Sequence, residues 1–540
     1  MAPADLRAEA EAIVARMSLD ERVAAVSGRD WWTTVGCARL GVKSVWLSDG
    51  PHGLRKCKSS AVVGGGLSLT TEAHCYPTAV TLGSSFDGNG SSGVNCAPDA
   101  PLAALGAYAT ISHAAGYELT TSRVVDGGFR ARRRRKRLRD EALALAAGAD
   151  AVVVVAGLPQ AYESECYDRL GLDLPPDQDA LIAAVAATRR DVVVVLQNGS
   201  PVAMPWVGDV AAVLEMYLAG EACGAALADL LFGAANPGGK LAETFAKSAA
   251  AHPSARTFGK MRQVVYDDRL DVGYRHFARP RHARDVLFPF GHGLSYTTFT
   301  YGEIALTPGA GACDPELRVA VANAGAVAGS EVVQLYVSER NPRLRRPLFE
   351  LKRFAKLFLE PGAAPGETKT ATFALDFRCF AYWDSRLEKW RADDGAFDLL
   401  VGASSADVRS RATWTVAGAT PRSAPPPPDE TFFMDAYVPP PDPILPLTLR
   451  SPMRDLAQAT WCGRLLLEAI KVLARAAPLM DFGAEVLQGD DLPLLQAFCH
   501  EGAMGLPISH LALHTCGKLS EAWLETRLLV AVNEGLLAAA

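Results

Sequence analysis

The sequence predicts an α/β domain followed by an all-β domain. Continuous apolar runs, typical of buried parallel strands, alternate with helix-like segments in the first half of the chain. After residue 301 the pattern changes to short alternating strands, which Gly, Pro and Asn separate. The chain has 540 residues, of which 49% are hydrophobic and 21% charged. A chain of this length and composition can bury more than one core.

The α/β domain is expected from three strand and helix pairs between about residues 100 and 239. AVVVVAG at 151–157 and VVVVLQ at 192–197 are continuous apolar runs, and the segments before them have helical spacing. The stretch 209–233, DVAAVLEMYLAGEACGAALADLLFG, supplies a further strand and helix. Alternation at this spacing predicts a parallel sheet with helices on both faces.

The segments on either side of this domain have different textures. Residues 1–28 have apolar positions at helical spacing with acids between them, which predicts an amphipathic helix and not a signal peptide. ELRVAVANAGAVAGSEVVQLYVSE at 316–339 predicts part of a β-sandwich. Residues 421–450, with PPPP and VPPPDP, predict a Pro-rich extended linker, and residues 451–540 a helical tail.

The charge and cysteine content exclude several classes of protein. The formal net charge is −6, so no global basic field attracts nucleic acid or an anionic membrane, and binding to a polyanion has to be local. No run of about 18 apolar residues suggests a transmembrane helix. The 11 cysteines are scattered without a CxxC pair, which favours reduced thiols and a cytoplasmic location. The sequence contains no metal-binding or cofactor-binding motif.

LSDGPHGLR, at residues 47–55, is the first candidate binding motif. The apolar VWL supplies a short strand, and the turn after it carries Asp49 and Arg55. A carboxylate that accepts hydrogen bonds from hydroxyls, beside a guanidinium that donates them, is suited to hold a polar ring. The alternative is that this Asp-Gly-Pro sequence is a structural turn.

YESECYDR, at residues 162–169, is the second candidate and directly follows a predicted buried strand. Ligands bind at the carboxyl ends of parallel strands in open α/β sheets, so Glu163, Glu165 and Asp168 stand where a site is expected. Acids beside an arginine are also suited to general acid catalysis, where one group carries the proton and another tunes it. The alternative is a solvated surface loop.

RARRRRKRLR, at residues 130–139, has eight basic residues in ten. Such a run is compatible with nuclear import or with a nucleic-acid patch. The alternative, which we favour at this point because no aromatic residues are interleaved, is a solvated insertion before a helix.

Together these motifs resemble glycoside hydrolase family 3, the β-glucosidase-type enzymes, and they occur in the family's order. SDGPHGLR and CYPTAVTLGSSFD resemble the family's first barrel segment. YESECYDRLGLDLPPDQDALI, VVVVLQNGSPVAMPW and LFPFGHGLSYTTF resemble its α/β sandwich domain, and GAFDLLVGASSADV resembles part of its fibronectin type III-like domain. The resemblance implies a remnant of a (β/α)8 barrel at 1–95, an α/β sandwich domain at 96–300 and a fibronectin type III-like domain at 301–420, before the linker and tail.

The resemblance implies a retaining hydrolase that removes terminal non-reducing β-D-glucosyl residues and needs two carboxylates about 5–5.5 Å apart. Glu165 is then the general acid/base, with Glu163 as the fallback, and Asp49 and Arg55 hold sugar hydroxyls. Cys166 stands where the family usually has Gly. The expected ligand is a small β-glucoside or oligosaccharide, with no nucleic-acid or membrane partner.

The resemblance also leaves a gap, because about 50 residues separate SDGPHGLR from the segment that joins the barrel to the second domain, whereas a whole barrel takes about 250. The family's Ser-Asp-Trp nucleophile motif falls in this gap. Asp87 and Asp384 are not credible substitutes, and Arg275-His276-Phe277 only superficially resembles the family's Lys-His-Phe. We therefore expect weak hydrolysis or none. The alternatives are a non-catalytic sugar-binding or structural remnant, or an incompletely assembled gene product.

Overall fold

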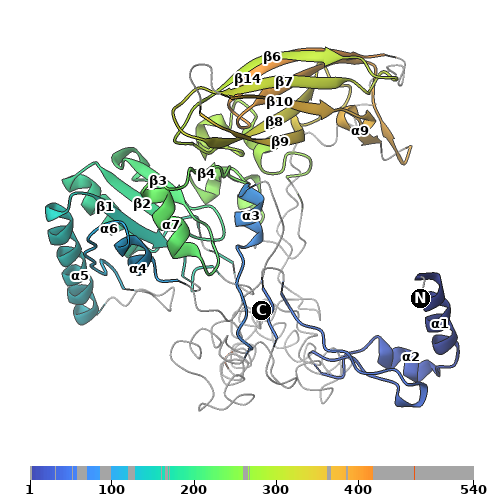
Figure 1. The fold of residues 1–540 in the computed structure, drawn as a ribbon, viewed down its shortest axis with the longest axis horizontal. Helices are drawn as coiled ribbons and strands as arrows, with labels where there is room; N and C mark the ends of the chain where they lie inside the picture. The colour runs from blue at the N-terminus through green and yellow to red at the C-terminus, as the bar shows by residue number, and fades with distance from the viewer. Residues whose placement is uncertain are drawn as a thin grey trace, which may run out of the picture.

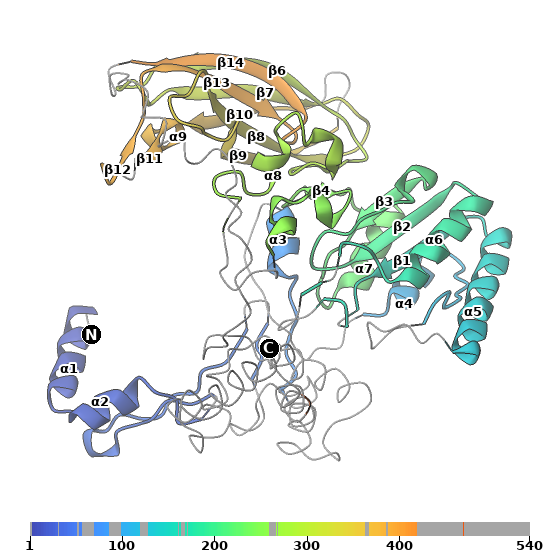
Figure 2. The same cartoon turned by 180° about the vertical axis from the view of Figure 1, so that it is seen from behind.

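The computed structural model describes residues 3–30, 32–50, 53–56, 70–85, 99–118, 128–159, 161–163, 168–169, 171–258, 266, 268–361, 367–384, 387–417 and 468. Figures 1 and 2 show an α/β domain beside a β-sandwich, with the first two helices apart from both. The predicted combination of an α/β domain and an all-β domain is therefore confirmed. The linker at 421–450 and the tail at 451–540 lie outside the described residues, except for Glu468.

The N-terminal segment consists of helices and isolated bridges. Helix α1 spans Pro3–Ala15, α2 spans Leu19–Ala25, and a 3-10 turn spans Ala38–Leu40. Ser18 and Glu21 form a reciprocal capping box that begins α2, yet this helix buries no side chain. Described residues 28–55 pair only through isolated bridges, so the barrel remnant stays a prediction.

The parallel sheet of the α/β domain has the strand order β1-β2-β3. Its elements are α5 (Phe129–Gly148), β1 (Val152–Gly157), α6 (Pro176–Thr188), β2 (Val192–Gln197), β3 (Ala212–Glu215) and α7 (Cys223–Leu231). Successive side chains of a strand point to opposite faces. Val194 packs in one core with Ile182 of α6, whereas Val195 packs in another with Leu227 of α7. Helices thus cover both faces, as the sequence predicts.

The segment before α5 packs against this domain. It contains α3 (Ala79–Ser85) and α4 (Pro101–Gly106). The carboxylate of Asp99 accepts hydrogen bonds from the backbone N–H groups of Gly224 and Ala225, both at 2.7 Å, where α7 begins. A carboxylate at this position accepts hydrogen bonds from otherwise unpaired N–H groups, and its negative charge interacts favourably with the positive end of the helix dipole.

The basic run forms the first half of α5, which corrects the expectation of an insertion before a helix. Arg and Lys are good helix formers because their straight side chains lose little rotamer freedom. Lys136 and Arg137 also form ion pairs one turn along the helix, with Asp140 at 2.5 Å and Glu141 at 3.1 Å. The helix therefore begins at Phe129, well before the apolar segment that starts at Ala142.

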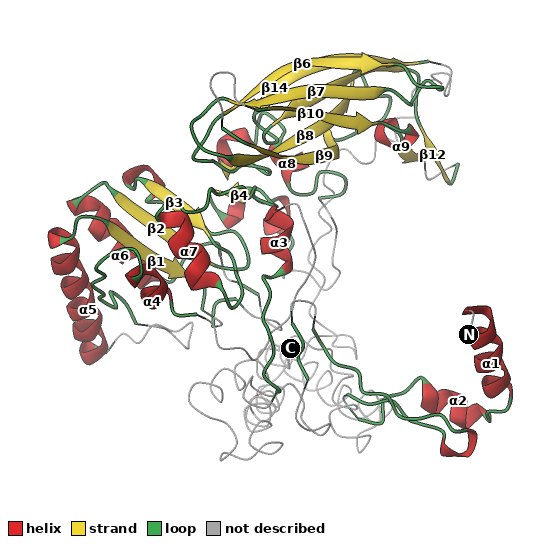
Figure 3. Ribbon diagram, viewed as in Figure 1, coloured by secondary structure: helices red, strands yellow, loops and turns green. Residues whose placement is uncertain are grey.

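The β-sandwich consists of two antiparallel sheets, drawn in yellow in Figure 3, with the orders β10-β7-β6 and β14-β13-β8-β9. Leu317, Val333 and Phe397 are among the fully buried residues between the sheets. The alternating burial along β7 explains why the sequence predicts this domain. The strands are β6 (Phe299–Thr307), β7 (Glu316–Asn323), β8 (Gly329–Glu339), β9 (Glu350–Leu359), β10 (Thr368–Ala374), β13 (Gly395–Gly402) and β14 (Val408–Val416).

Short elements connect the two domains and decorate the sandwich. They are the 3-10 turns Val207–Asp209, Ala249–Ala251, Pro253–Arg256 and Ala283–Asp285, the strands β4 (Phe245–Ala246), β5 (Val286–Phe288), β11 (Tyr382–Asp384) and β12 (Lys389–Arg391), and the helices α8 (Tyr274–Phe277) and α9 (Phe377–Phe380).

A buried ion pair joins the two domains. Nζ of Lys240, from the α/β domain, lies 3.3 Å from Oε2 of Glu331 on β8, and it also donates to the carbonyl of Gly293 at 2.7 Å. The other carboxylate oxygen of Glu331 accepts from the hydroxyl of Tyr301 at 2.8 Å. Both charged side chains are almost fully buried, so each depends on the other for compensation.

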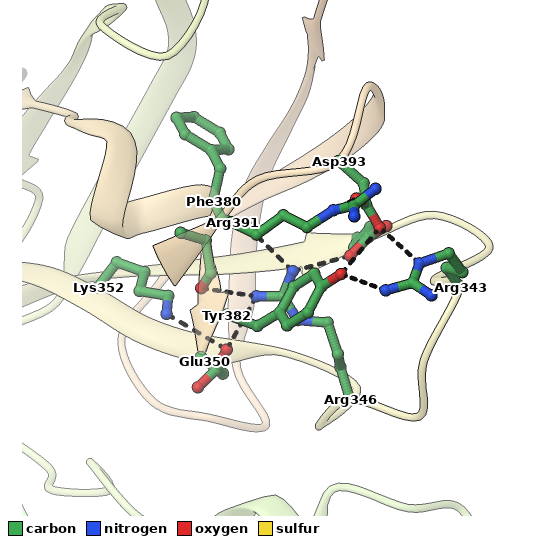
Figure 4. A network of polar contacts seen from close by, with 10 residues as sticks. Arg343, Arg346, Glu350, Lys352, Phe380, Tyr382, Arg391 and Asp393 are labelled. Atoms are coloured by element: carbon green, nitrogen blue, oxygen red, sulfur yellow. Dashed lines mark hydrogen bonds and ion pairs between the residues drawn. The ribbon is translucent and has the colours of Figure 1, made fainter. Parts of the chain in front are cut away.

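A second polar network holds one end of the sandwich together (Figure 4). The buried carboxylate of Asp393 accepts from Nε of Arg391 at 2.5 Å, Nε of Arg343 at 3.3 Å and the hydroxyl of Tyr382 at 3.3 Å. Arg346 donates to the carbonyl of Phe380 at 3.0 Å. These contacts tie the β8–β9 connection to α9 and to the β11–β12 hairpin.

No helix in the described part of the chain is both long enough and apolar enough to cross a lipid bilayer.

Candidate functional site

Polar side chains from three strands meet at the carboxyl edge of the parallel sheet. Glu163 and Arg169 follow β1, Ser200 follows β2, and Glu215 ends β3. In the parallel register Gly157 pairs with Gln197 and Leu196 pairs with Glu215, so the three strands end side by side. This is the edge at which open α/β sheets bind ligands. We call these residues, together with Asn198, Gly199 and Glu243, the carboxyl-edge cluster.

The loop after β1 is fastened to the loop after β2 at two points. The carboxylate of Glu163 accepts hydrogen bonds from the backbone N–H of Gly199 at 2.6 Å and from the hydroxyl of Ser200. Nη1 of Arg169 donates to Ser200 Oγ at 2.9 Å and to the carbonyl of Pro201 at 2.7 Å. Charge-assisted hydrogen bonds of this kind are about twice as strong as neutral ones. Residues 163 and 169 are therefore both held on the chain segment 199–201.

Glu215 is a carboxyl group in a buried environment at the end of β3. Burial raises the pKa of its carboxyl group from 4.5 to about 8, and the nearby charges of Glu163 and Glu243 add to this effect. Hydrogen bonds from the backbone N–H of Tyr217 at 2.9 Å and from Nδ2 of Asn198 at 3.2 Å oppose it. Tyr217 has a φ of 49°, a strained value for a bulky residue that often accompanies functional sites.

Glu243 has a similar environment. Burial raises the pKa of its carboxyl group to about 7, the charge of Glu163 raises it further, and the guanidinium of Arg169 lowers it. Two buried carboxyl groups with raised pKa values thus lie near Glu163 and Arg169, and carboxyl groups of this kind are candidates for proton transfer. Such a set suits general acid and base chemistry on a polar substrate.

The structure describes some of the predicted residues of the YESECYDR motif but not others. Glu165 lies outside the described residues, as does Cys166. Glu163 belongs to the carboxyl-edge cluster, where its carboxylate is occupied by hydrogen bonds to the main chain and to Ser200. Asp168 is exposed. Glu163 and Arg169, which bond to the segment 199–201, lie on either side of Glu165 in the sequence.

Asp49 and Arg55 lie in the N-terminal segment and contact each other. The N–H of Arg55 donates to the carbonyl of Asp49 at 2.9 Å, and Nη1 of Arg55 lies 3.4 Å from Oδ2 of Asp49. In Figures 1 and 2 the described N-terminal segment runs apart from strands β1–β3. The turn thus pairs these two side chains, and their role as sugar ligands stays a prediction.

The weak nucleophile candidates have structural roles or lie outside the described residues. Asp384 is buried, and its Oδ2 lies 3.8 Å from Nη2 of Arg343. Arg275 forms an ion pair with Glu350 of the sandwich at 3.2 Å, and His276 is buried. Asp87 lies outside the described residues.

Sequence reasoning missed Glu215, Glu243 and Ser200. Glu215 is the first polar residue after the apolar run of β3, so its place at a strand end is visible in the sequence. Glu243 and Ser200 lie in connections whose proximity depends on the fold. Among the described residues, no group of three or more His, Cys, Asp or Glu is placed to hold a metal ion.

Comparison with known proteins agrees with this architecture. Residues 54–296 match the glycosyl hydrolase family 3 C-terminal domain, and residues 331–405 match the fibronectin type III-like domain. Thermostable beta-glucosidase B of Acetivibrio thermocellus is 48% identical over 263 residues, which cover 48% of this chain and 34% of that protein. A beta-glucosidase of Rhizobium radiobacter is 43% identical over 270 residues, which cover 48% of this chain and 32% of that protein.

The crystal structure of the GH3 beta-glucosidase of Bifidobacterium adolescentis matches with a TM-score of 0.55 and 33% identity, over 70% of this chain and 51% of that one. The chain spans about a third of the length of the two sequence relatives. Residues 54–296 therefore carry the C-terminal domain of glycosyl hydrolase family 3, and residues 331–405 carry a fibronectin type III-like domain.

Proposed function

We propose that this chain is a β-glucosidase-type glycoside hydrolase that releases terminal non-reducing β-D-glucosyl residues by a retaining mechanism. The proposal rests most directly on the fastening of Glu163 and Arg169 to the segment 199–201. Glu165 lies between these two fastened residues in the sequence. The relatives that support the substrate class are named β-glucosidases.

In this proposal Glu165 is the general acid/base. It protonates the glycosidic oxygen as the bond to the sugar breaks and a carboxylate attacks the anomeric carbon. It then takes a proton from the water that releases the sugar from the covalent intermediate. Glu163 is a positioning residue, because its oxygens already accept two hydrogen bonds. We propose that Asp49 and Arg55 bind sugar hydroxyls.

Turnover is expected to be slow. The retaining mechanism needs a carboxylate nucleophile, and the sequence offers no counterpart of the family's nucleophile motif. Without a well-placed nucleophile, acid catalysis and binding alone give a small part of the usual acceleration.

The retaining mechanism can be tested by adding azide to purified Glu165→Gln together with an activated aryl β-glucoside, and by identifying the products. Azide needs no general base, so in the variant it replaces water at the second step and β-glucosyl azide forms. Glu72→Gln, at an exposed position outside the cluster, serves as the control and releases glucose without a gain from azide. Formation of the α-azide, or no azide product alongside measurable wild-type activity, would contradict the mechanism.

The second candidate is a non-catalytic sugar-binding protein. The matched part of the chain covers only about a third of the two sequence relatives, and this observation favours it. It predicts that glucose raises the melting temperature while no β-glucoside is hydrolysed. Hydrolysis that depends on Glu165 would exclude it.

A further inference from the structure

The first half of helix α5 carries a dense set of exposed cations that hydrolysis of a neutral glucoside does not use. The side chains of Arg130, Arg132, Arg133, Arg134, Lys136 and Arg137 are on exposed residues. The helix lies at the outer edge of the α/β domain (Figures 1 and 2). A group of α5 side chains that includes five of these arginines and lysines also lines an open surface hollow.

Only part of this charge is compensated within the protein. Arg134 pairs with Glu118, Arg135 with Asp177, Lys136 with Asp140 and Arg137 with Glu141. Among the described residues, Arg130, Arg132, Arg133 and Arg139 of the run form no ion pair.

The spacing of the cations forms a row. Positions 130, 133, 134 and 137 follow the i, i+3, i+4, i+7 pattern, so they share one face of the helix. At 1.5 Å per residue this row is about 10 Å long. A nucleic-acid strand carries one phosphate about every 3.4 Å along a duplex axis, so the row can face about three of them. Arginine is suited to phosphate because its planar fork donates two parallel hydrogen bonds.

The packing of α5 argues against a membrane surface as the partner. A helix that lies in a membrane interface needs a free apolar face. In α5 the apolar side chains of Ala142, Leu143 and Ala146 pack into the core of the α/β domain. Phe129 at the start of the helix is 80% exposed, and a single exposed ring can stack on a base but forms no apolar face.

We propose that the first half of α5 binds the phosphate backbone of a nucleic acid without sequence specificity. This departs from the expectation drawn from the net charge of −6. That expectation concerns the summed field, whereas at physiological salt charges more than about 8 Å away are largely screened. The neighbouring acids are already paired, so the local field at the start of α5 is positive.

The test is fluorescence anisotropy of a labelled 20-base-pair duplex with the full chain, over a series of salt concentrations. We expect a Kd in the range of about 10⁻⁴–10⁻⁶ M at physiological salt and a slope of log K against log salt of about −2.7 for three phosphate contacts. Replacing Arg130, Arg132 and Arg133 by Gln weakens binding at least tenfold and flattens the slope by about 1.8, because Arg130 and Arg133 belong to the row. Replacing them by Lys keeps most of the binding, because the charge remains.

The control removes the same charge elsewhere, with Gln at the exposed positions Arg7, Arg284 and Arg411. This variant keeps the binding and the slope of the wild type. Equal losses in both Gln variants would overturn the proposal, as would the absence of binding to the duplex. Binding to phosphatidylserine vesicles without binding to the duplex would also overturn it. Circular dichroism establishes that each variant is folded.

Discussion

Glu163 and Arg169 share one hydroxyl group, because Ser200 Oγ donates to the carboxylate of Glu163 and accepts from Nη1 of Arg169 at 2.9 Å. The two residues bracket the position at which we place the general acid/base. The same segment after β2 also carries Asn198, which donates to Glu215 at the end of β3. The ends of strands β1, β2 and β3 are thereby linked by side-chain hydrogen bonds at one edge of the sheet.

Ser200→Ala tests this bracket. The variant leaves Glu163 and Arg169 each without one partner in a partly buried site, so we expect a loss of about 1–3 kcal/mol of stability. Amide hydrogen exchange in peptides that span residues 161–171 becomes faster. Ser44→Ala, which removes a hydroxyl bound to the carbonyl of Thr34 in the N-terminal segment, leaves exchange in those peptides unchanged. Equal exchange in wild type and Ser200→Ala would show that the hydroxyl does not hold the loop.

The raised pKa of Glu215 predicts that the protein becomes less stable as the pH rises. Its pKa is about 8 in the folded protein against an ordinary 4.5, so the folded state binds one more proton between these values. The free energy of unfolding therefore loses about 1.4 kcal/mol per pH unit from this group, in the window from about pH 5 to pH 8. Below pH 4.5 the full contribution is present.

The measurement is urea denaturation of wild type and Glu215→Gln at a series of pH values. The difference in free energy between them changes by about 1.4 kcal/mol per pH unit across the window, in the direction that favours the variant at higher pH. The exposed control Glu303→Gln gives a constant difference. A constant difference for Glu215→Gln as well would mean that this carboxyl group is ionised throughout.

The buried pair of Lys240 and Glu331 predicts strong coupling between two substitutions. Lys240→Met leaves the Glu331 carboxylate buried without its cation, at a cost of about 3–5 kcal/mol. The double variant with Glu331→Gln recovers part of that loss, since no buried charge remains. The exposed pair of Arg318 and Glu316 is the control, and Arg318→Met changes stability by less than about 1 kcal/mol. Additive effects of the two buried substitutions would exclude the coupling.

We expect Asp393 to contribute strongly to the stability of the sandwich end shown in Figure 4. Asp393→Asn removes the charge that three donors share, and with it the buried ion pairs to Arg391 and Arg343. We expect a loss of about 3–5 kcal/mol and a lower melting temperature by calorimetry. Asp407→Asn, in an exposed pair with Arg409, shifts the melting temperature little. A small shift for Asp393→Asn as well would show that the network contributes little.

The sequence predicts the sheets well because their apolar patterns are local. The apolar run of β2 is buried along most of its length, whereas that of β1 is buried on one face and exposed at Val153 and Val155 on the other. The alternation along β7 follows directly from burial on one face. The first half of α5 is missed because its charge suggests a solvated loop, although the helix propensity of Arg and the i,i+4 acids favour a helix.

The candidate site is predicted only in part, because it is assembled from separate segments. The strand-end position of Glu163 is visible in the sequence, but its partners Gly199 and Ser200 come from the next strand. Glu215 joins them through the strand order and the parallel register, whereas Glu243 comes from the connection between α7 and β4. The raised pKa values of these two groups depend on burial, which no local pattern encodes.

The most direct test of the central claim is glucose release from an alkyl β-D-glucoside, whose leaving alcohol needs protonation, by wild type and by Glu165→Gln. The account predicts slow release above the protein-free background in the wild type, a loss of at least a hundredfold in the variant, and the wild-type rate in Glu72→Gln. Equal rates in wild type and Glu165→Gln, or no release by the wild type, would contradict the assignment of Glu165 as the general acid/base of an active β-glucosidase.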